Sequence, residues 1–339
     1  MTSYVPILRA REAELQAWQH VDRRVPSHAR PIFELVPEGK RTGPVAFVNH
    51  VKKHWTTPGL VTFDLGTLRH SMSARRAADT VDHVANALWG GCIEARPVVQ
   101  IGDPPGVLDL ASTAHRELGV GVAARLRLDD GQEPADLMLL MAGTDVTVED
   151  VDLVLDCGHL ADAAATARAV VIATDALAWA ARQGIWRSVT LAAGAFPTSI
   201  GELPKGRPTR LRRLDAQLWS KVAGGPVQPH FGDRGIAGPP FAGPSFRGPL
   251  PNLRYAFAED WWVWREERGL PGSEPVRTLC GRVVDSEAWR ASGFSWGDSQ
   301  IARCADGRGG PGNATSWLAW ATSHHLATVT ERLGRLGVP

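Results

Sequence analysis

Cysteine is scarce in this chain, and the few cysteines are far apart. The four, Cys92, Cys157, Cys280 and Cys304, form no CxxC pair. Structural zinc sites usually draw on such closely spaced pairs, and small secreted domains that depend on disulfides carry a higher density of cysteine. We therefore expect reduced thiols, neither a structural zinc site nor a disulfide framework, and a cytoplasmic protein.

The chain also lacks an excess of positive or negative charge. The 339 residues carry a formal net charge of +1, so the chain as a whole has no electrostatic attraction to nucleic acid or to anionic lipid. One local cluster is the exception: Arg207, Arg210, Arg212 and Arg213. This cluster is either a phosphate-binding patch or a solvated face, and the abundance of arginine throughout the chain favours the solvated face.

Long apolar runs and phosphate-binding loops are also absent. The N-terminal residues lack the basic and apolar regions of a signal peptide, and Asp162, Arg168 and Asp175 interrupt the alanine-rich segment 161–181. We therefore expect neither a signal peptide nor a membrane span. No apolar run is followed by GxGxxG or GxxxxGKS/T, so the usual dinucleotide-binding and P-loop sites are not predicted.

Short apolar runs alternate with segments of helical period. The runs lie at residues 5–8, 32–36, 60–65, 97–101, 120–128, 151–155 and 189–193, with an eighth candidate at 227–231. Amphipathic helices are predicted at 12–21, 74–89, 111–118, 161–170 and 173–183. Near-continuous apolar strands separated by helices are typical of a parallel sheet buried on both faces. We predict an α/β fold, a (β/α)8 TIM-type barrel, whose usual ~250 residues leave roughly 90 for insertions. A doubly wound open sheet is the alternative.

The composition changes abruptly at residues 224–251, where glycine or proline occupies half of the positions. Such a stretch cannot be a helix or a central strand, and Phe231, Phe241 and Phe246 favour an ordered loop over a flexible linker. Strands are predicted at 253–258 and 261–265, and a last helix at 312–333. The predicted units are the barrel strands (1–232), an insertion after strand eight that forms a lid or small subdomain (233–311) and a closing C-terminal helix (312–339).

Acidic residues stand at or near the ends of five predicted strands: Glu34, Asp64, Asp103, Asp156 and Asp233. In a parallel barrel, the carboxyl ends of the strands and the loops after them build the active site. Convergent carboxylates suit a divalent cation such as Mg2+, or a general acid/base pair. Because like charges repel, removal of one is expected to be neutral or slightly stabilising. The structural alternatives are helix capping and an ion-pair ring, and Asp103, which precedes two prolines, is expected to serve a turn.

Arginine supplies the opposite charge. Arg9 and Arg11 follow the first predicted strand, and Arg254 lies in the insertion. Together they would bind an anionic group such as phosphate.

The C-terminal region mixes polar residues with tryptophan and glycine, and from it we single out Asp298, His325, Trp296 and Asn313. Neighbouring positions such as His324 and His325 point about 100° apart on a helix, so at most one of the two faces a site. The tryptophans are either a stacking platform for bases or sugars, or a core where the insertion docks on the barrel. Asn313 also fits a helix N-cap.

Short motifs follow one another along nearly the whole chain. They are Tyr4-Val5-Pro6-Ile7-Leu8-Arg9-Ala10-Arg11 with Glu14, Pro31-Ile32-Phe33-Glu34, Asp156-Cys157-Gly158, Phe196-Pro197, Phe231-Gly232-Asp233-Arg234-Gly235-Ile236, Asn252-Leu253-Arg254-Tyr255, Phe294-Ser295-Trp296-Gly297-Asp298, Gly312-Asn313-Ala314-Thr315 and His324-His325. In this order they resemble the Beta protein family of the bacteriophage type. Arg9 and Arg11 stand where lysines are usual in that family, and Arg234 where an aromatic residue is usual. Arginine keeps the charge of lysine but cannot act as a deprotonated amine.

The resemblance implies a protein of prophages or mobile elements, with a role in antiviral defence against other phages. Its partners would then be nucleic acid, a nucleotide or a phage protein, together with proteins encoded nearby. The resemblance names no reaction.

Two hypotheses about function stay open. In the first, the chain is a metal-assisted phosphodiester or nucleotide hydrolase that uses Mg2+ or another divalent cation. Its ligands or general base would be Glu34, Asp64, Asp156, Asp233 and Asp298, its phosphate clamps Arg9, Arg11 and Arg254, and its acid or orienting group His325. In the second, a non-catalytic binding or sensor module holds a nucleotide or phage component. Carboxylates that form a cluster able to hold a cation favour the enzyme, whereas carboxylates paired with fixed arginines favour the sensor.

Overall fold

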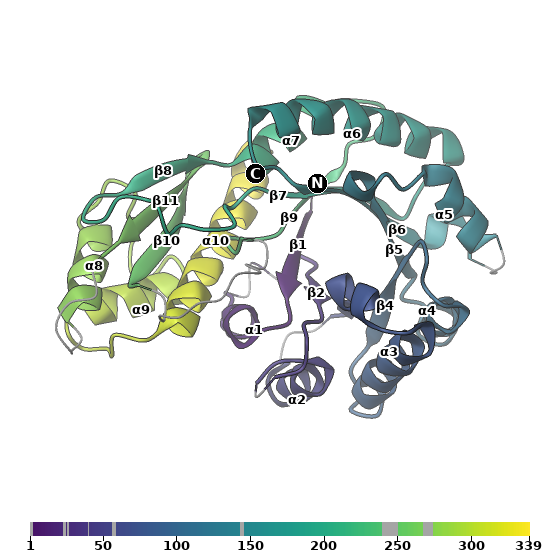
Figure 1. Ribbon diagram of the computed structural model, residues 1–339, viewed down its shortest axis with the longest axis horizontal. Helices are drawn as coiled ribbons and strands as arrows, with labels where there is room; N and C mark the ends of the chain where they lie inside the picture. Colours follow the sequence, from purple (N-terminus) through teal and green to yellow (C-terminus); the bar gives the residue numbers. More distant parts are fainter. Residues whose placement is uncertain are drawn as a thin grey trace.

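The computed structural model describes residues 3–22, 25, 27–39, 41–55, 59–142, 146–238, 250–266 and 274–339. Its centre is a closed barrel of eight parallel strands (Figure 1). In barrel order these are β1 (Tyr4–Arg9), β2 (Ile32–Glu34), β3 (Val61–Asp64), β4 (Ala95–Gln100), β5 (Val122–Arg127), β6 (Val151–His159), β7 (Ser188–Gly194) and β9 (His230–Asp233). The predicted barrel is confirmed, and the open-sheet alternative is wrong because β9 pairs with both β1 and β7.

A helix follows each barrel strand and covers the outside of the barrel. These helices are α1 (Glu12–Gln19), α2 (Pro44–His54), α3 (Ala74–Trp89), α4 (Pro105–Leu118), α5 (Pro134–Met141), α6 (Ala163–Gln183), α7 (Leu214–Val222) and α10 (Ala314–Leu336), with short 3-10 turns η1 (Gly66–Ser71), η2 (Leu128–Asp130) and η3 (Val148–Asp150) between some of them. Proline is the first residue of α2, α4 and α5. The N–H at this position has no partner within the helix, so proline, which lacks an N–H, loses no hydrogen bond there. The last barrel strand begins three residues later than predicted, directly after Pro229, because proline cannot donate to the ladder.

The segments predicted as two helices, 161–170 and 173–183, form the single helix α6. The two residues between the predicted helices, Val171 and Ile172, are β-branched, and such residues lower helix propensity only slightly. Within the described residues, α6 is also the one helix long and apolar enough to cross a membrane by length and composition alone. In the barrel it is an outer helix that packs against β6 and α7 (Figure 1). The cytoplasmic location stays a prediction.

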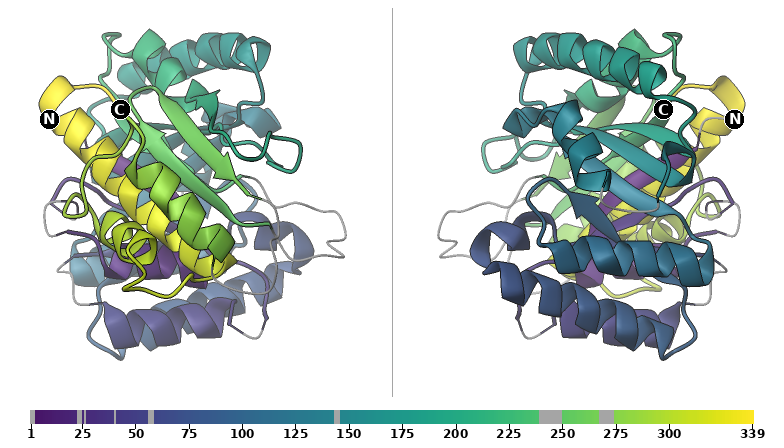
Figure 2. Two further views of the ribbon diagram at one scale, coloured as in Figure 1. Left: turned by 90° about the vertical axis from the view of Figure 1, so that its left-hand side faces the viewer. Right: turned by 90° about the vertical axis from the view of Figure 1, so that its right-hand side faces the viewer.

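A smaller unit lies beside the barrel (Figures 1 and 2). It contains an antiparallel sheet in the order β10-β11-β8 and two helices, namely β8 (Thr209–Arg212), β10 (Asn252–Phe257), β11 (Asp260–Arg265), α8 (Glu274–Val284) and α9 (Trp296–Ala305). β8 comes from the loop between β7 and α7, so the unit also draws on the segment 1–232. Helix α10 joins the two parts, because it packs against α1 and β1 of the barrel and against β10 of the sheet.

The tryptophans of β11 explain how the sheet docks. Trp261 belongs to the barrel core and meets the Phe196 ring at 5.3 Å between centroids. Trp262 and Trp264 point to the other face and pack in the core of the smaller unit. The alternation of a strand thus places neighbouring tryptophans in two different cores. Phe231 is buried in β9, whereas Phe241 and Phe246 lie outside the described residues.

The inside of the barrel is layered. Its middle layer is apolar and contains Val5, Ile7, Ile32, Val98, Ala123, Val154 and Ala192. Near the amino ends of the strands, a buried Arg96 pairs with Asp152 at 2.6 Å. The carboxyl ends, by contrast, carry a dense network of charges around a cavity.

Candidate functional site at the carboxyl end of the barrel

Three barrel strands carry the same local motif, Asp-X-Gly, at or near their carboxyl ends. In each, an aspartate oxygen accepts a hydrogen bond from the glycine N–H two residues later, at 2.9 Å. The motifs are Asp64-Leu65-Gly66, Asp156-Cys157-Gly158 and Asp233-Arg234-Gly235. Each glycine has a positive φ, of 54°, 67° and 61°, which side chains with a Cβ rarely adopt. The first role of these carboxylates is therefore to fix the backbone bend near the strand end, which in β6 is an irregularity between Asp156 and His159.

Arg125 occupies the centre of the network. It lies on β5, is fully buried, and donates to Glu34 at 2.8 Å and to Asp64 at 2.6 Å. It also bonds Asp156 through two guanidinium nitrogens. One arginine thus neutralises carboxylates that come from β2, β3 and β6.

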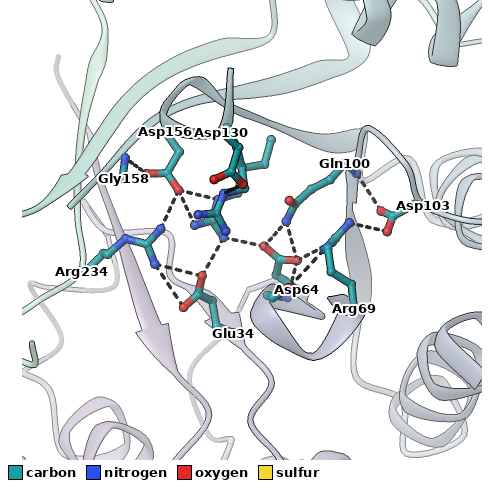
Figure 3. A network of polar contacts seen from close by, with 12 residues as sticks. Glu34, Asp64, Arg69, Gln100, Asp103, Asp130, Asp156, Gly158 and Arg234 are labelled. Atoms are coloured by element: carbon teal, nitrogen blue, oxygen red, sulfur yellow. Dashed lines mark hydrogen bonds and ion pairs between the residues drawn. The ribbon is translucent and has the colours of Figure 1, made fainter. Parts of the chain in front are cut away.

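A second arginine, Arg234, extends the network from the end of β9. It bonds Glu34 at 3.1 Å and Asp156 at 2.8 Å (Figure 3). On the opposite side, Gln100 and Arg69 both donate to Asp64. We call Glu34, Asp64 and Asp156, with Arg125 and Arg234, the floor of the site.

The arginines keep the floor carboxylates ionised. Burial alone would raise the pKa of Glu34, but Arg234 and Arg125 outweigh it and lower that pKa to about 2. The same two arginines hold the pKa of Asp156 below its usual range against the effect of burial. Neither carboxylate carries a proton near neutral pH, so neither can serve there as a general acid.

This pairing reverses the expected effect of removing a carboxylate. The sequence predicted mutual repulsion, so that deletion would be neutral or stabilising. With Arg125 fully buried among them, deletion instead leaves part of a buried cation without its partner, which is destabilising. Among the described residues, no group of three or more His, Cys, Asp or Glu side chains is arranged to hold a metal ion.

A cavity of about 620 Å³ opens above the floor, and we call it the mouth cavity. Its walls come from the ends of β1, β2, β5, β6 and β9. The charged and polar residues that line it are Arg9, Arg11, Glu34, Glu38, Thr42, Thr67, Arg127, Asp129, His159 and Arg234. Of the residues predicted for a site, Arg9, Arg11 and Glu34 therefore line the cavity, while Asp64 and Asp156 lie in the floor beneath it.

The β1 side of the mouth cavity carries positive charge that is incompletely paired. In the described part of the chain, no acceptor is bonded to the Arg9 guanidinium, and Nε of Arg11 is buried without a partner while its NH2 group bonds Glu14 at 2.5 Å. Burial and the nearby Arg11 lower the pKa of Arg9 to about 10. The same two causes lower the pKa of Arg254 to about 10.

Arg254 stands beside this side of the cavity without lining it. It donates to the Ile236 carbonyl at 2.8 Å and lies 4.6 Å from the centre of the Phe196 ring. We call Arg9, Arg11 and Arg254 the arginine wall.

Sequence reasoning missed several residues at the site, among them Arg125, Arg234 and His159. Arg125 sits inside the predicted apolar run 120–128, where a charged residue needs a buried partner, and that was the available signal. His159 follows Gly158 at the end of β6 and lines the cavity. Burial and the charge of Arg234 lower the pKa of His159, and its Nδ1 is buried without a partner.

Asp233 and His325 form a second cluster, away from the mouth cavity. Asp233 accepts from Tyr4 Oη at 2.7 Å and meets His325 Nε2 at 2.8 Å, with Arg213 at 3.8 Å. All are buried. Asp233 points outward from the barrel toward α10, because it alternates with Arg234, which points inward. The predicted role of Asp233 and His325 at the mouth is therefore not supported by where they lie.

Asp298 belongs to a third cluster, within the smaller unit. It accepts from Tyr255 Oη at 2.6 Å and Ser295 Oγ at 2.5 Å, and it meets His324 Nδ1 at 2.9 Å. The other ring nitrogen of His324 faces the Ala256 carbonyl at 2.8 Å. The hydroxyl of Thr328 lies 3.1 Å from the same ring nitrogen. The structure thus gives Asp298 a structural partner and no access to the mouth cavity.

The last two predicted residues also lie elsewhere. Trp296 stacks on His20 at the end of α1, with ring centroids 4.5 Å apart. Asn313 caps α10 by accepting from the N–H groups of Thr315 and Ser316. Trp296 therefore connects the smaller unit to α1, and Asn313 begins α10. Neither residue lines the mouth cavity.

The fold and the site define a (β/α)8-barrel protein with an arginine-lined cavity at the carboxyl end of its strands. The chain belongs to the Beta protein family, whose model matches residues 4–331. The predicted resemblance is confirmed at the level of the family. None of the curated proteins and none of the solved structures matches this chain.

Proposed function

We propose that this protein binds a phosphate-bearing ligand of about nucleotide size in the mouth cavity, as a binding module. The observation that carries the proposal is the state of Arg9. Its guanidinium lines the cavity, is repelled by Arg11, and has no bonded acceptor among the described residues. A half-buried cation in this state is best stabilised by an anion that enters the cavity.

The size and shape of the cavity support a small ligand. Its volume of about 620 Å³ lies within the range of roughly 300–1,000 Å³ that small-molecule sites occupy. Arg9 and Arg11 on one side of the cavity present planar guanidinium groups, which suit the oxygens of phosphate. A mononucleotide or a similar phosphate ester fits these features.

The alternative, metal-assisted hydrolysis, receives less support from the geometry. Each floor carboxylate predicted as a metal ligand accepts hydrogen bonds from Arg125. A cation placed there would have to displace a buried arginine from three partners, at a large cost in free energy. Carboxylates paired with fixed arginines are the arrangement that favours a binding or sensor module.

Binding calorimetry tests the proposal. Inorganic pyrophosphate and a set of nucleoside 5′-diphosphates are titrated into the wild-type protein, Arg9→Ala and the control Arg335→Ala, whose exposed arginine lies on α10. Because a charge-assisted hydrogen bond contributes about 1.5–3 kcal/mol, Arg9→Ala should weaken binding by about 10- to 100-fold, and the control by less than about twofold. Equal affinity of all three proteins, or no binding to the wild type, would overturn the proposal.

Two further assays separate binding from turnover and connect it to biology. Incubation of bound nucleotides with Mg2+ should give no hydrolysis product above that of a protein-free control. If the protein acts in a prophage or mobile-element defence system, as the family resemblance predicts, cells that carry Arg9→Ala should lose protection against phage while the folded protein persists. Product formation that depends on Asp156 would instead establish the hydrolase.

A further inference from the structure

A second, smaller cavity adjoins the mouth cavity. It has a volume of about 240 Å³ and lies between η2, the end of β6 and the start of α6. We call it the side cavity. Asp129 and His159 line both cavities, so these two residues form the boundary between them.

The boundary between the two cavities is thin because Gly158, which lies there, has no side chain. A Cβ at this position would lie 2.0 Å from Oδ2 of Asp129 and could not be accommodated. The absence of a side chain there lets the Asp129 carboxylate pack directly against the backbone. One carboxylate and one imidazole, rather than a layer of packed side chains, therefore separate the two spaces.

The side cavity combines aliphatic and polar walls. Leu128, Leu160, Ala165, Ala169 and Ile172 line it together with Asp129, His159 and Arg168. Arg168 stands at the same cavity, and no carboxylate is paired with it in the described ranges. Aliphatic walls favour an uncharged group, and a planar guanidinium stacks on flat, unsaturated rings.

The boundary residues add hydrogen-bonding capacity between the two spaces. The Asp129 carboxylate can accept hydrogen bonds. It pairs with Arg127, and its side chain is still partly exposed. His159 is held neutral near pH 7, because burial and Arg234 lower its pKa, and its Nδ1 has no partner in the described structure. A neutral imidazole can donate or accept, according to its tautomer.

From this juxtaposition we infer that the ligand is a nucleotide, with its phosphate against Arg9 in the mouth cavity and its base in the side cavity, beside Arg168. The inference rests on the proposed function and names its ligand class. Asp129 and His159 lie where the sugar would cross from one cavity to the other. A polyol alone would leave its hydroxyl groups against aliphatic walls, and a lipid chain would leave Asp129 and Arg168 facing hydrocarbon.

The test fills the side cavity and leaves the mouth cavity unchanged. Ala165 is half-buried on the first turn of α6 and lines the side cavity, so Ala165→Phe projects a ring into it. The matched control is Ala164→Phe, one position earlier on the same helix and exposed. Ile172→Trp, at a cavity residue that is 43% exposed, is a second filling variant that the fold tolerates at its surface.

Inorganic pyrophosphate and the four nucleoside 5′-diphosphates serve as probes in calorimetric titrations. We expect at least one nucleoside diphosphate to bind the wild type about tenfold or more tightly than pyrophosphate, since stacking of a base adds to the affinity. Ala165→Phe and Ile172→Trp should abolish this difference and change pyrophosphate affinity by less than about twofold. Ala164→Phe should behave as the wild type.

The results separate the two proposals. If pyrophosphate binds through Arg9 but no nucleoside diphosphate binds more tightly, the nucleotide inference is wrong and the anion site stands. The inference is equally wrong if both filling variants keep the full preference for a nucleotide. If neither pyrophosphate nor any nucleotide binds, both proposals fail.

Discussion

The floor and the arginine wall hold the same kinds of charge in opposite states. In the floor, Arg125 is fully buried and bonds three carboxylates, so every charge is compensated inside the protein. In the wall, Arg9 has no bonded acceptor in the described chain and is repelled by Arg11. The difference teaches that a charged barrel mouth is not one functional unit. Its floor holds strands together, and its wall is left for a ligand.

The largest expected effect is on the floor. Arg125→Met removes the shared partner of Glu34, Asp64 and Asp156 and leaves them buried beside one another. We expect the free energy of unfolding to fall by about 3–5 kcal/mol, as when one member of a buried ion pair is removed. Urea denaturation at pH 7 measures the change.

Arg335→Met is the control for this comparison, because its side chain is 70% exposed and pairs with Glu331 at the surface. It should change the free energy of unfolding by less than about 1 kcal/mol. If Arg125→Met lowered the free energy of unfolding by as little as this, the ion pairs of the floor would be no more stabilising than one at the surface.

The third cluster offers a smaller effect of the same sign. Asp298→Ala leaves Tyr255, Ser295 and His324 without the oxygen that each one bonds. We expect the free energy of unfolding to fall by about 1–3 kcal/mol, and pyrophosphate affinity to be unchanged in the protein that stays folded. A loss of affinity without a loss of stability would instead return Asp298 to the binding site.

The pH dependence of stability distinguishes the floor from an exposed carboxylate. The pKa of Glu34 is lowered to about 2 in the folded state, so its contribution is fully present above the unfolded pKa of about 4.3 and is lost as pH falls toward 2. Glu34→Gln should therefore show a smaller loss of stability between pH 5 and pH 2.5 than the wild type, by urea denaturation at each pH.

Asp79→Asn, which removes an exposed carboxylate on α3, controls for the general effect of acid. It should follow the wild-type curve. An identical curve for Glu34→Gln would mean that the ion pairs of Glu34 add nothing to stability in this range.

The fold could be predicted from the sequence because its signals are periodic and local. Apolar runs at 5–8, 32–36 and 189–193 each became a barrel strand, and buried parallel strands are marked by just such runs. The smaller unit was predicted incompletely, since β8 carries the polar sequence Thr209–Arg212 and joins its sheet through partners more than forty residues away.

The site could be predicted only in part, for a physical reason. Position at a strand end brought Glu34, Asp64 and Asp156 together, because parallel strands end at one rim. Position at a strand end does not by itself give the direction of a side chain. Asp233, the last residue of β9, points away from the barrel, whereas Arg234, the next residue, points into it. The partner of a charge is a property of the tertiary structure, and so the role of Arg125 emerged only there.

The smallest expected change in stability belongs to Arg9, and it accompanies the largest change in function. Arg9 is destabilised by burial and by Arg11, attracted by Glu14 and Glu34, and has no bonded acceptor in the described residues. Arg9→Ala should therefore leave the melting temperature of the unliganded protein equal or slightly higher.

The most direct test of the account is therefore the shift in melting temperature that inorganic pyrophosphate causes in the wild type and in Arg9→Ala, measured at the same ligand concentrations. A ligand that binds the folded state stabilises it by RT ln(1 + [L]/Kd), so the melting temperature rises with ligand concentration and rises less when binding is weaker. We predict a concentration-dependent rise for the wild type and a much smaller rise for Arg9→Ala at the same concentrations, while the unliganded variant melts no lower than the wild type. A lower melting temperature for unliganded Arg9→Ala, together with equal shifts in both proteins, would contradict the account, because Arg9 would then be part of the scaffold and not of a binding site.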